Sequence, residues 1–293
     1  MPKSPAWKRI AAILLLTAWF SSVSAHAQKP PQKRQVKDST PAAPATASAL
    51  PVGSYHALIV GINNYQSLPK LQTAVNDAAA LAKLLQEQYG FADIKLLPNA
   101  TRNQILLALN AFKHNLPENS NLLIYYAGHS YRDQETYEVY WLPVDAKSDN
   151  QDKRISADDI TSDLRAIPSR HILIICDGYF SSVLTREVDV PIPPSDRAIY
   201  LTRLLQSKSR TVMSSPGGEP VEDAGAAGHS VFAYAVLKYL SEMEDQQFAA
   251  ADLFPRIERE VAGRSDRVPQ YSIIQNSGHE FGDFVFSRRV KNK

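Results

Sequence analysis

The sequence contains a single cysteine, Cys176, and therefore no Cys-x-x-Cys pair. One cysteine cannot form a disulfide within the chain, so a small fold held together by disulfides is excluded. No group of His and Cys residues has the spacing of zinc ligands, so the sequence gives no sign of a metal-stapled fold. We expect the domain to be stabilised by an ordinary hydrophobic core.

The sequence also lacks a basic surface once its N-terminal part is set aside. Seven of the 32 Lys and Arg residues lie in residues 1–53, whereas only Asp38 of the 30 acids does. Residues 54–293 therefore carry 25 basic and 29 acidic residues, a formal net charge of −4. A domain of this charge gives no electrostatic reason to bind nucleic acid, and we predict no nucleic-acid partner.

Only one long apolar run is present, at residues 10–20, and three basic residues precede it. The run is too short for a comfortable membrane span. It is followed by an Ala-x-Ala site at residues 25–27, which together with the basic start is typical of a secretory signal peptide over residues 1–27. We expect an exported, periplasmic bacterial protein without stable membrane insertion after cleavage. An uncleaved anchor stays open as the alternative.

Residues 28–53 are rich in Pro, Ala, Lys and Thr and show no apolar periodicity. Such a segment cannot bury enough apolar surface to offset the entropy lost on ordering, so it is predicted to be a disordered linker. Residues 54–286 show no second linker and no repeat, and we interpret them as one domain. Residues 287–293 form a short basic tail.

The first half of the domain alternates between strand and helix patterns. Apolar runs typical of buried parallel strands occur at 56–62, 93–97, 121–126 and 171–176. Helix patterns lie between them, at 71–89 before Gly90, at 101–114 with a Thr-x-x-Gln capping box, and at 156–165.

The second half is less regular. It is predicted to contain the end of a helix at 201–206, a strand at 210–215, helices at 228–243 and 248–262, and a closing strand at 281–286. The alternation predicts an α/β fold with a mostly parallel six-stranded sheet sandwiched between helices. In such sheets, ligands bind at the carboxyl ends of the strands.

Short segments spread over the whole domain resemble one family. In chain order they are ALIVGINNY (57–65), AVNDA (74–78), YYAGHS (125–130), YWLPVDA (140–146), ILIICDGYFSS (172–182), GHSVFAYAVLKYL (228–240) and GDFVF (282–286). Their order and spacing are similar to the caspase-like cysteine peptidases of clan CD, especially the bacterial metacaspase-like (orthocaspase) group. The resemblance implies a caspase-like fold with a large-subunit-like part (54–184), a connecting loop (185–197) and a small-subunit-like part (198–286).

The resemblance also implies a pair of catalytic positions. His129 matches the family's histidine, which assists a cysteine thiolate in attacking the scissile carbonyl. The family's nucleophile loop reads Asp, a small residue, Cys, an aromatic residue, Ser and Gly. DGYFSS matches this loop with Tyr179 at the cysteine position, and Ser130 replaces a glycine whose backbone N–H helps to bind the oxyanion.

Three replacement nucleophiles must be weighed against loss of the thiol: Cys176, the phenol of Tyr179, and a nearby serine. Cys176 lies three residues before Tyr179, but it belongs to the apolar strand, where a free cysteine behaves as a small buried hydrophobe. A phenol with a pKa near 10 attacks amides far less readily than a thiolate does. Ser181 or Ser182 paired with His129 is a further alternative, although nothing in the sequence positions either hydroxyl.

The resemblance further implies a specificity pocket for Arg or Lys, in which Asp77 and Asp177 match the family's acids. A carboxylate can bind a guanidinium through two parallel hydrogen bonds. We therefore expect a peptide or protein with exposed Arg or Lys as the partner. The alternative is that Asp77 only decorates a helix and Asp177 only ends a strand.

Calcium is a possible cofactor by the same resemblance, through Asp158 and Asp159 after the acidic segment 145–152. The favoured interpretation is simpler: no cofactor is expected, and these acids complement the dipole at the start of a helix. The connecting loop contains Arg186 and Arg197, at which self-cleavage would require an active nucleophile.

The sequence thus predicts an exported caspase-fold protein that lacks the catalytic cysteine and retains a cleft for Arg- or Lys-containing segments. The alternative is an active cysteine-type endopeptidase of Arg/Lys specificity.

Overall fold

The structure is a computed structural model that describes residues 50–180, 196–215, 217 and 226–289. The predicted signal peptide and most of the predicted linker lie outside the described residues. So do most of the connecting loop, including Arg186, and both Ser181 and Ser182. Within the described part of the chain, no helix is both long and apolar enough to span a membrane.

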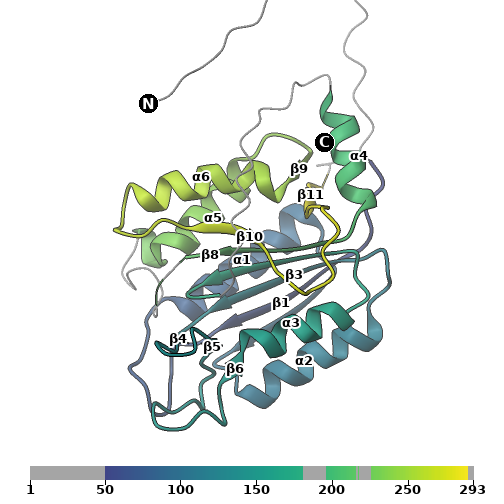
Figure 1. Ribbon diagram of the computed structural model, residues 1–293. Helices are drawn as coiled ribbons and strands as arrows, with labels where there is room; N and C mark the ends of the chain where they lie inside the picture. The colour runs from purple at the N-terminus through teal and green to yellow at the C-terminus, as the bar shows by residue number, and fades with distance from the viewer. Residues whose placement is uncertain (1–49, 181–195, 216, 218–225, 290–293) are drawn as a thin grey trace, which may run out of the picture. The chain divides into compact units, whose positions relative to one another are not determined.

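A six-stranded sheet forms the centre of the domain (Figure 1). Five strands are parallel, and β10 at one edge is antiparallel to β8. Across the sheet the order is β10 (Gln270–Ile273), β8 (Ser209–Ser214), β7 (His171–Asp177), β3 (Asn121–Ala127), β1 (Tyr55–Gly61) and β2 (Asp93–Pro98). The predicted α/β class with a mostly parallel six-stranded sheet is confirmed.

Helices cover both faces of this sheet, as Figure 1 shows, with α2 and α3 on one side and α5 and α6 on the other. Helix α1 packs against β1, β3 and α5. The bounds are α1 (Ala74–Tyr89), α2 (Arg102–Asn115), α3 (Ala157–Ala166), α4 (Arg197–Gln206), α5 (Val231–Glu242) and α6 (Ala250–Ala262). Coverage of both faces explains why the central strands β3 and β7 are buried along their whole length.

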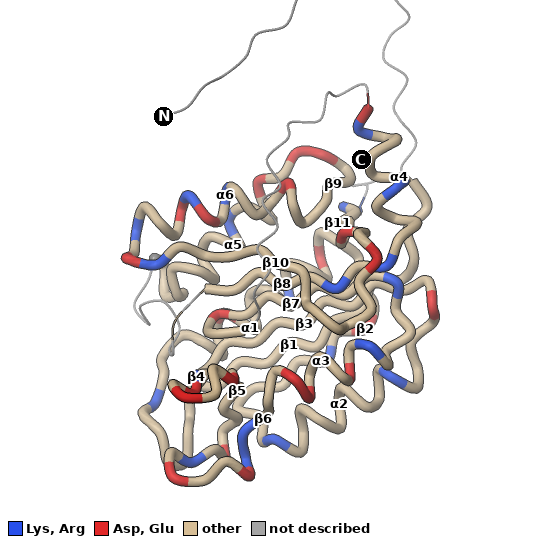
Figure 2. Tube along the Cα trace, viewed as in Figure 1, with Lys and Arg blue, Asp and Glu red and all other residues tan. Residues whose placement is uncertain are grey.

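The charged residues lie mainly in the helices and loops around the sheet (Figure 2). The strands themselves are largely apolar, and the side chains of Leu58, Ile124 and Ile174 are completely buried. The core is therefore built from the runs that the sequence marked as buried strands. It needs no disulfide, and Cys176 is a free, buried thiol.

Local sequence signals explain several helix ends. Gly90 has a left-handed conformation (φ 71°) and its N–H donates to the carbonyl of Leu85, which ends α1. Thr101 and Gln104 form the predicted capping box at the start of α2. Ser156 caps α3, and its hydroxyl accepts from the N–H of Asp159 at 3.0 Å.

The edge of the sheet differs from the prediction. The sixth strand of the central sheet is β10, which the sequence did not indicate, and not the segment 281–286. That segment contributes to β11 (Val285–Ser287), which pairs antiparallel with β9 (Gln247–Ala249) in a separate two-stranded sheet. Phe281 has a positive φ of 64°, which is incompatible with the extended strand that the apolar residues of segment 281–286 suggested.

A small three-stranded sheet was also missed. It is made of β4 (Ser130–Arg132), β5 (Val139–Trp141) and β6 (Ile155–Ser156). These strands are only two or three residues long, which is too short for a periodic pattern. Their importance is positional, because β4 begins directly after His129.

The ordered contacts of the domain begin before the predicted boundary at residue 54. The main chain of Leu50 donates to Gln247 Oε1 and accepts from its Nε2, both at 2.8 Å. At the other end of the connecting loop, Arg197 begins α4 and pairs with Asp245 and Asp252 at 3.0 and 3.2 Å. These two ion pairs therefore fix the side chain of Arg197 on the domain surface.

Candidate site at the carboxyl ends of the central strands

The two predicted catalytic loops are neighbours because β3 and β7 are adjacent parallel strands. Their last residues, Ala127 and Asp177, are paired across the sheet. The chain then continues from β3 into Gly128 and His129, and from β7 into Gly178 and Tyr179. The structure thus brings the two loops to one edge of the sheet, where ligand sites of α/β folds form.

His129 is held in place by three contacts from the first loop of the domain. Its backbone N–H donates to the Tyr65 hydroxyl at 2.7 Å, and the two rings lie 4.6 Å apart between centroids. Its Nε2 lies 2.9 Å from the carbonyl oxygen of Pro69. Because a carbonyl can only accept, Nε2 carries the proton, and Nδ1 is then the basic nitrogen of the neutral ring. His129 as a whole residue is 5% exposed.

Ser130 links the two loops through its side chain. Its hydroxyl accepts from the N–H of Tyr179 at 2.8 Å and donates to the carbonyl of Gly217 at 3.1 Å. A glycine at this position could make neither bond. The family resemblance points only to the backbone N–H of Ser130, whereas the hydroxyl is the group that joins the two loops.

The close approach of the two loops depends on Gly178, which has no side chain. A Cβ placed on Gly178 would lie 2.9 Å from Ser130 Oγ and 3.5 Å from the carbonyl oxygen of Gly128. Any larger residue at 178 would therefore push against Ser130 and lengthen the bond to Tyr179. This explains why a glycine separates Asp177 from Tyr179.

Cys176 and Tyr179 occupy different environments. Cys176 is completely buried, and its thiol lies 3.7 Å from the carbonyl of Tyr179. Burial raises the pKa of this thiol well above its ordinary value, so it is protonated and poorly nucleophilic at neutral pH. Tyr179 lies on the loop beside Ser130, half-buried against the core. The assignment of Tyr179 to the nucleophile position stays a prediction from the motif.

Asp77 and Asp177 meet through Ser230, the N-cap residue of α5. The Ser230 hydroxyl donates to Asp177 Oδ2 and accepts from the N–H of Ala233 at 3.0 Å, while its backbone N–H lies 3.4 Å from Asp77 Oδ2. Both aspartates are buried. The two acids that the resemblance placed in one pocket therefore share one partner residue.

His229 occupies the other oxygen of Asp77. Its Nδ1 lies 2.6 Å from Asp77 Oδ1, and the imidazole remains 18% exposed. The preceding residue, Gly228, accepts from Asn76 Nδ2 at 3.0 Å, so this segment is fastened to α1 at two points. Burial raises the pKa of Asp77 to about 6, and the hydrogen bond and charge of His229 partly offset that rise.

Asp158 and Asp159 lie apart from this site, on the exposed first turn of α3. Among the residues that the structure describes, no group of three or more His, Cys, Asp or Glu side chains could hold a metal ion. The two acids fit the dipole of the helix, and we derive no calcium-dependent step. The calcium alternative stays a prediction.

Sequence reasoning missed four residues of the site: Tyr65, Pro69, His229 and Ser230. One signal was available. Ser230 precedes an apolar helix, which is the position of an N-cap, and a serine there was open to recognition. Tyr65 and His229 lie within segments quoted for the resemblance, but their contacts join residues far apart in the sequence, so no local pattern announces them.

Comparison with known proteins settles the family. The caspase domain profile matches residues 54–279. This chain belongs to the caspase domain family. The match covers every strand of the central sheet and both loops that carry His129 and Tyr179.

Structural comparison agrees at the level of the fold, with 238 solved chains matching. One is the crystal structure of a Geobacter sulfurreducens protein from a structural genomics programme, with a TM-score of 0.51 and 16% identity. The alignment covers 79% of this chain and 100% of that chain. At this identity the likeness concerns only the fold. No curated protein matches the chain.

Proposed function

We propose that this caspase-domain protein does not hydrolyse peptide bonds and instead binds Arg- or Lys-containing segments of a peptide or partner protein. The single observation that carries the first part is Tyr179 on the loop beside His129 and Ser130. The signal-like N-terminal segment supports export to a bacterial periplasm.

Inactivity follows from the chemistry of the groups at hand. Attack on an amide needs a nucleophile that the imidazole can activate. Cys176 is enclosed by the core and keeps its proton, and a phenol at 179 is a poor substitute near neutral pH. His129 can orient or accept a hydrogen bond, but it has no thiol to assist.

Binding of a basic side chain is supported by the pair of carboxylates around Ser230. Two buried acids that share Ser230 as a partner favour a positively charged group, because a charge in a partly dehydrated site needs an opposite charge. His229 now occupies one oxygen of Asp77 from within the chain. A guanidinium stays charged at all working pH values and makes two parallel hydrogen bonds, so it can displace the imidazole.

The competition with His229 makes the proposal testable by calorimetry. Titration of an Arg-containing peptide should give binding heat with the wild type, and the matched peptide with Gln in place of Arg should give none. Asp177→Asn should abolish binding while keeping the size of the side chain. His229→Ala should bind about 5-fold more tightly, because the internal competitor is removed.

Asp158→Asn is the matched control, since it removes an exposed acid outside the site and should leave binding unchanged. Unfolding temperatures should be recorded for each variant, so that a lost site is distinguished from a lost fold. Absence of heat for both the wild type and His229→Ala would end the binding proposal.

The alternative, an active cysteine-type endopeptidase, draws support from membership of the caspase domain family. It would require Cys176 to leave the strand or a hydroxyl to act as nucleophile. The complete burial of Cys176 weighs against the first route.

A further inference from the structure

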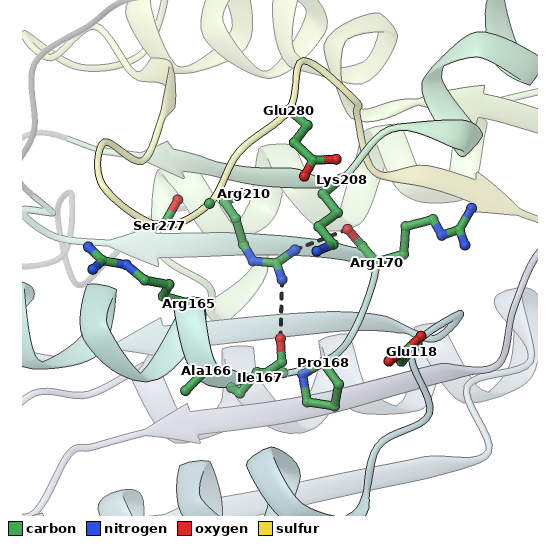
Figure 3. Close-up of a pocket in the computed structure, with 11 residues that line it drawn as sticks. Glu118, Arg165, Ala166, Ile167, Pro168, Arg170, Lys208, Arg210, Ser277 and Glu280 are labelled. Atoms are coloured by element: carbon green, nitrogen blue, oxygen red, sulfur yellow. Dashed lines mark hydrogen bonds between the residues drawn. The ribbon is translucent and has the colours of Figure 1, made fainter.

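A second pocket lies at the opposite end of the sheet from Asp177 and Tyr179. It has a volume of about 340 Å³ and is formed by the end of α3, the loop before β7, the start of β8 and the loop 277–280. Figure 3 shows Arg210 and Lys208 near the middle of the view, Glu280 above Lys208, and Arg165 and Arg170 to the left and right.

The floor of this pocket is a buried guanidinium. Arg210 is 2% exposed, and all five of its N–H donors point to main-chain carbonyls. These carbonyls belong to Leu164, Ile167, Ser169, Arg170 and Ser209, at 2.8 to 3.2 Å. Burial lowers the pKa of Arg210 to about 10, and nearby Glu280 partly offsets the effect. Arg210 therefore stays charged at neutral pH.

The charge of Arg210 has no ion-pair partner in the described part of the chain. Its five acceptors are neutral carbonyls, and no carboxylate lies within ion-pair distance of its guanidinium. A buried cation whose hydrogen-bond acceptors are all neutral carbonyls contributes a positive potential to the adjacent cavity, and Glu280 offsets only part of it.

Three further cations line the same cavity: Arg165, Arg170 and Lys208. In the described residues, the side chains of Lys208 and Arg170 make no hydrogen bond or ion pair, and Arg165 donates to the carbonyl of Asn276. Glu118 and Glu280 also line the pocket. Four cations against two acids leave a net positive lining whose outer donors are available to a ligand.

We propose that this pocket binds a small dianion of the phosphate class, as inorganic phosphate or a phosphate ester. A phosphate group carries close to two negative charges at pH 7 and three strong acceptor oxygens, which matches the excess of two cations and the free donors of Lys208 and Arg170. The volume lies at the lower end of small-ligand sites, which favours a compact ligand.

Isothermal titration of the full chain with inorganic phosphate tests this directly, with sodium chloride at matched ionic strength as the reference. Binding on the order of 1 mM is expected, because the pocket is open and two acids compete for its cations. Lys208→Ala should weaken binding about 10-fold, and Glu280→Gln should strengthen it by a few fold, since it removes a competing carboxylate.

Lys95→Ala is the matched control, because Lys95 is an exposed lysine on β2 and should leave phosphate binding unchanged. Lys208 is itself exposed, so its variant should fold normally. The proposal is overturned if phosphate binds no better than chloride, if Lys208→Ala binds as the wild type does, or if Lys95→Ala weakens binding equally.

Discussion

The two ends of the central sheet differ in the sign of their buried charges and in the groups that contact them. At the carboxyl ends, Asp77 and Asp177 are acids whose partners, His229 and Ser230, come from the same chain. At the amino ends, Arg210 is a cation held only by main-chain carbonyls, beside a cavity lined by further cations. A ligand at the acidic end must displace His229, which already contacts Asp77. An anion at the basic end would displace nothing and would supply the negative charge that the cations there lack.

The largest effect is expected at the basic end. Arg210→Met would remove five hydrogen bonds and leave buried carbonyls without donors, at a cost of about 4 kcal/mol in the free energy of unfolding. Arg210→Lys should cost less, because it keeps the charge but loses the planar fork. Urea denaturation measures both. A loss of less than about 1 kcal/mol in the free energy of unfolding for Arg210→Met would mean that these five hydrogen bonds contribute little to stability.

The acidic end should lose less, and two serine caps allow a matched measurement. Ser156→Ala removes only the cap of α3 and should cost about 1 kcal/mol. Ser230→Ala removes the cap of α5 and also the hydroxyl that donates to buried Asp177, so about 3 kcal/mol is expected. Urea denaturation of the two variants in parallel gives the difference. Equal costs would show that the bond to Asp177 contributes nothing.

A smaller effect concerns the pH dependence of the acidic end. Because burial raises the pKa of Asp77 to about 6 in the folded state, the native protein holds a proton that the unfolded chain releases above its ordinary pKa near 4. The stability contributed by this proton is present below about pH 4 and is lost as the pH rises through 6.

Asp77→Asn removes that dependence. Relative to the wild type, its free energy of unfolding should rise by about 2 kcal/mol between pH 4.5 and 7.5. Urea titrations at several pH values provide the measurement, and exposed Asp158→Asn is the control. A difference between variant and wild type that stays constant with pH would remove Asp77 as the titrating group.

The sequence predicted the parallel core because its strands are continuous apolar runs buried on both faces, as in β3 and β7. Helix ends followed from local chemistry, since Gly90 and the Thr101 capping box act on backbone groups within a few residues. These features are local, and local patterns carry them.

The missed features depend on contacts between distant segments. The edge strand β10 has only four residues, and packing decides its place beside β8. The more apolar segment at 281–286 was therefore predicted as the sixth strand instead. Likewise, the bond between His229 and Asp77 joins residues 152 apart, and the surroundings of Arg210 are main-chain carbonyls that no residue type reveals.

For the candidate site, the motif indicated His129, Ser130, Asp77 and Asp177, and the structure brings them to one edge of the sheet. The motif could not show which groups these side chains contact. The hydroxyl of Ser130 joins the two loops, and Ser230 joins the two acids, which only the three-dimensional arrangement makes apparent.

We propose that the absence of a thiol at position 179, rather than the fold, prevents peptide hydrolysis. The most direct measurement compares the wild type, Tyr179→Cys and the double variant Tyr179→Cys with His129→Ala on fluorogenic Arg and Lys peptide substrates. We expect no hydrolysis by the wild type, hydrolysis by Tyr179→Cys, and loss of that hydrolysis in the double variant. Hydrolysis by the wild type that disappears in Cys176→Ala would contradict this proposal.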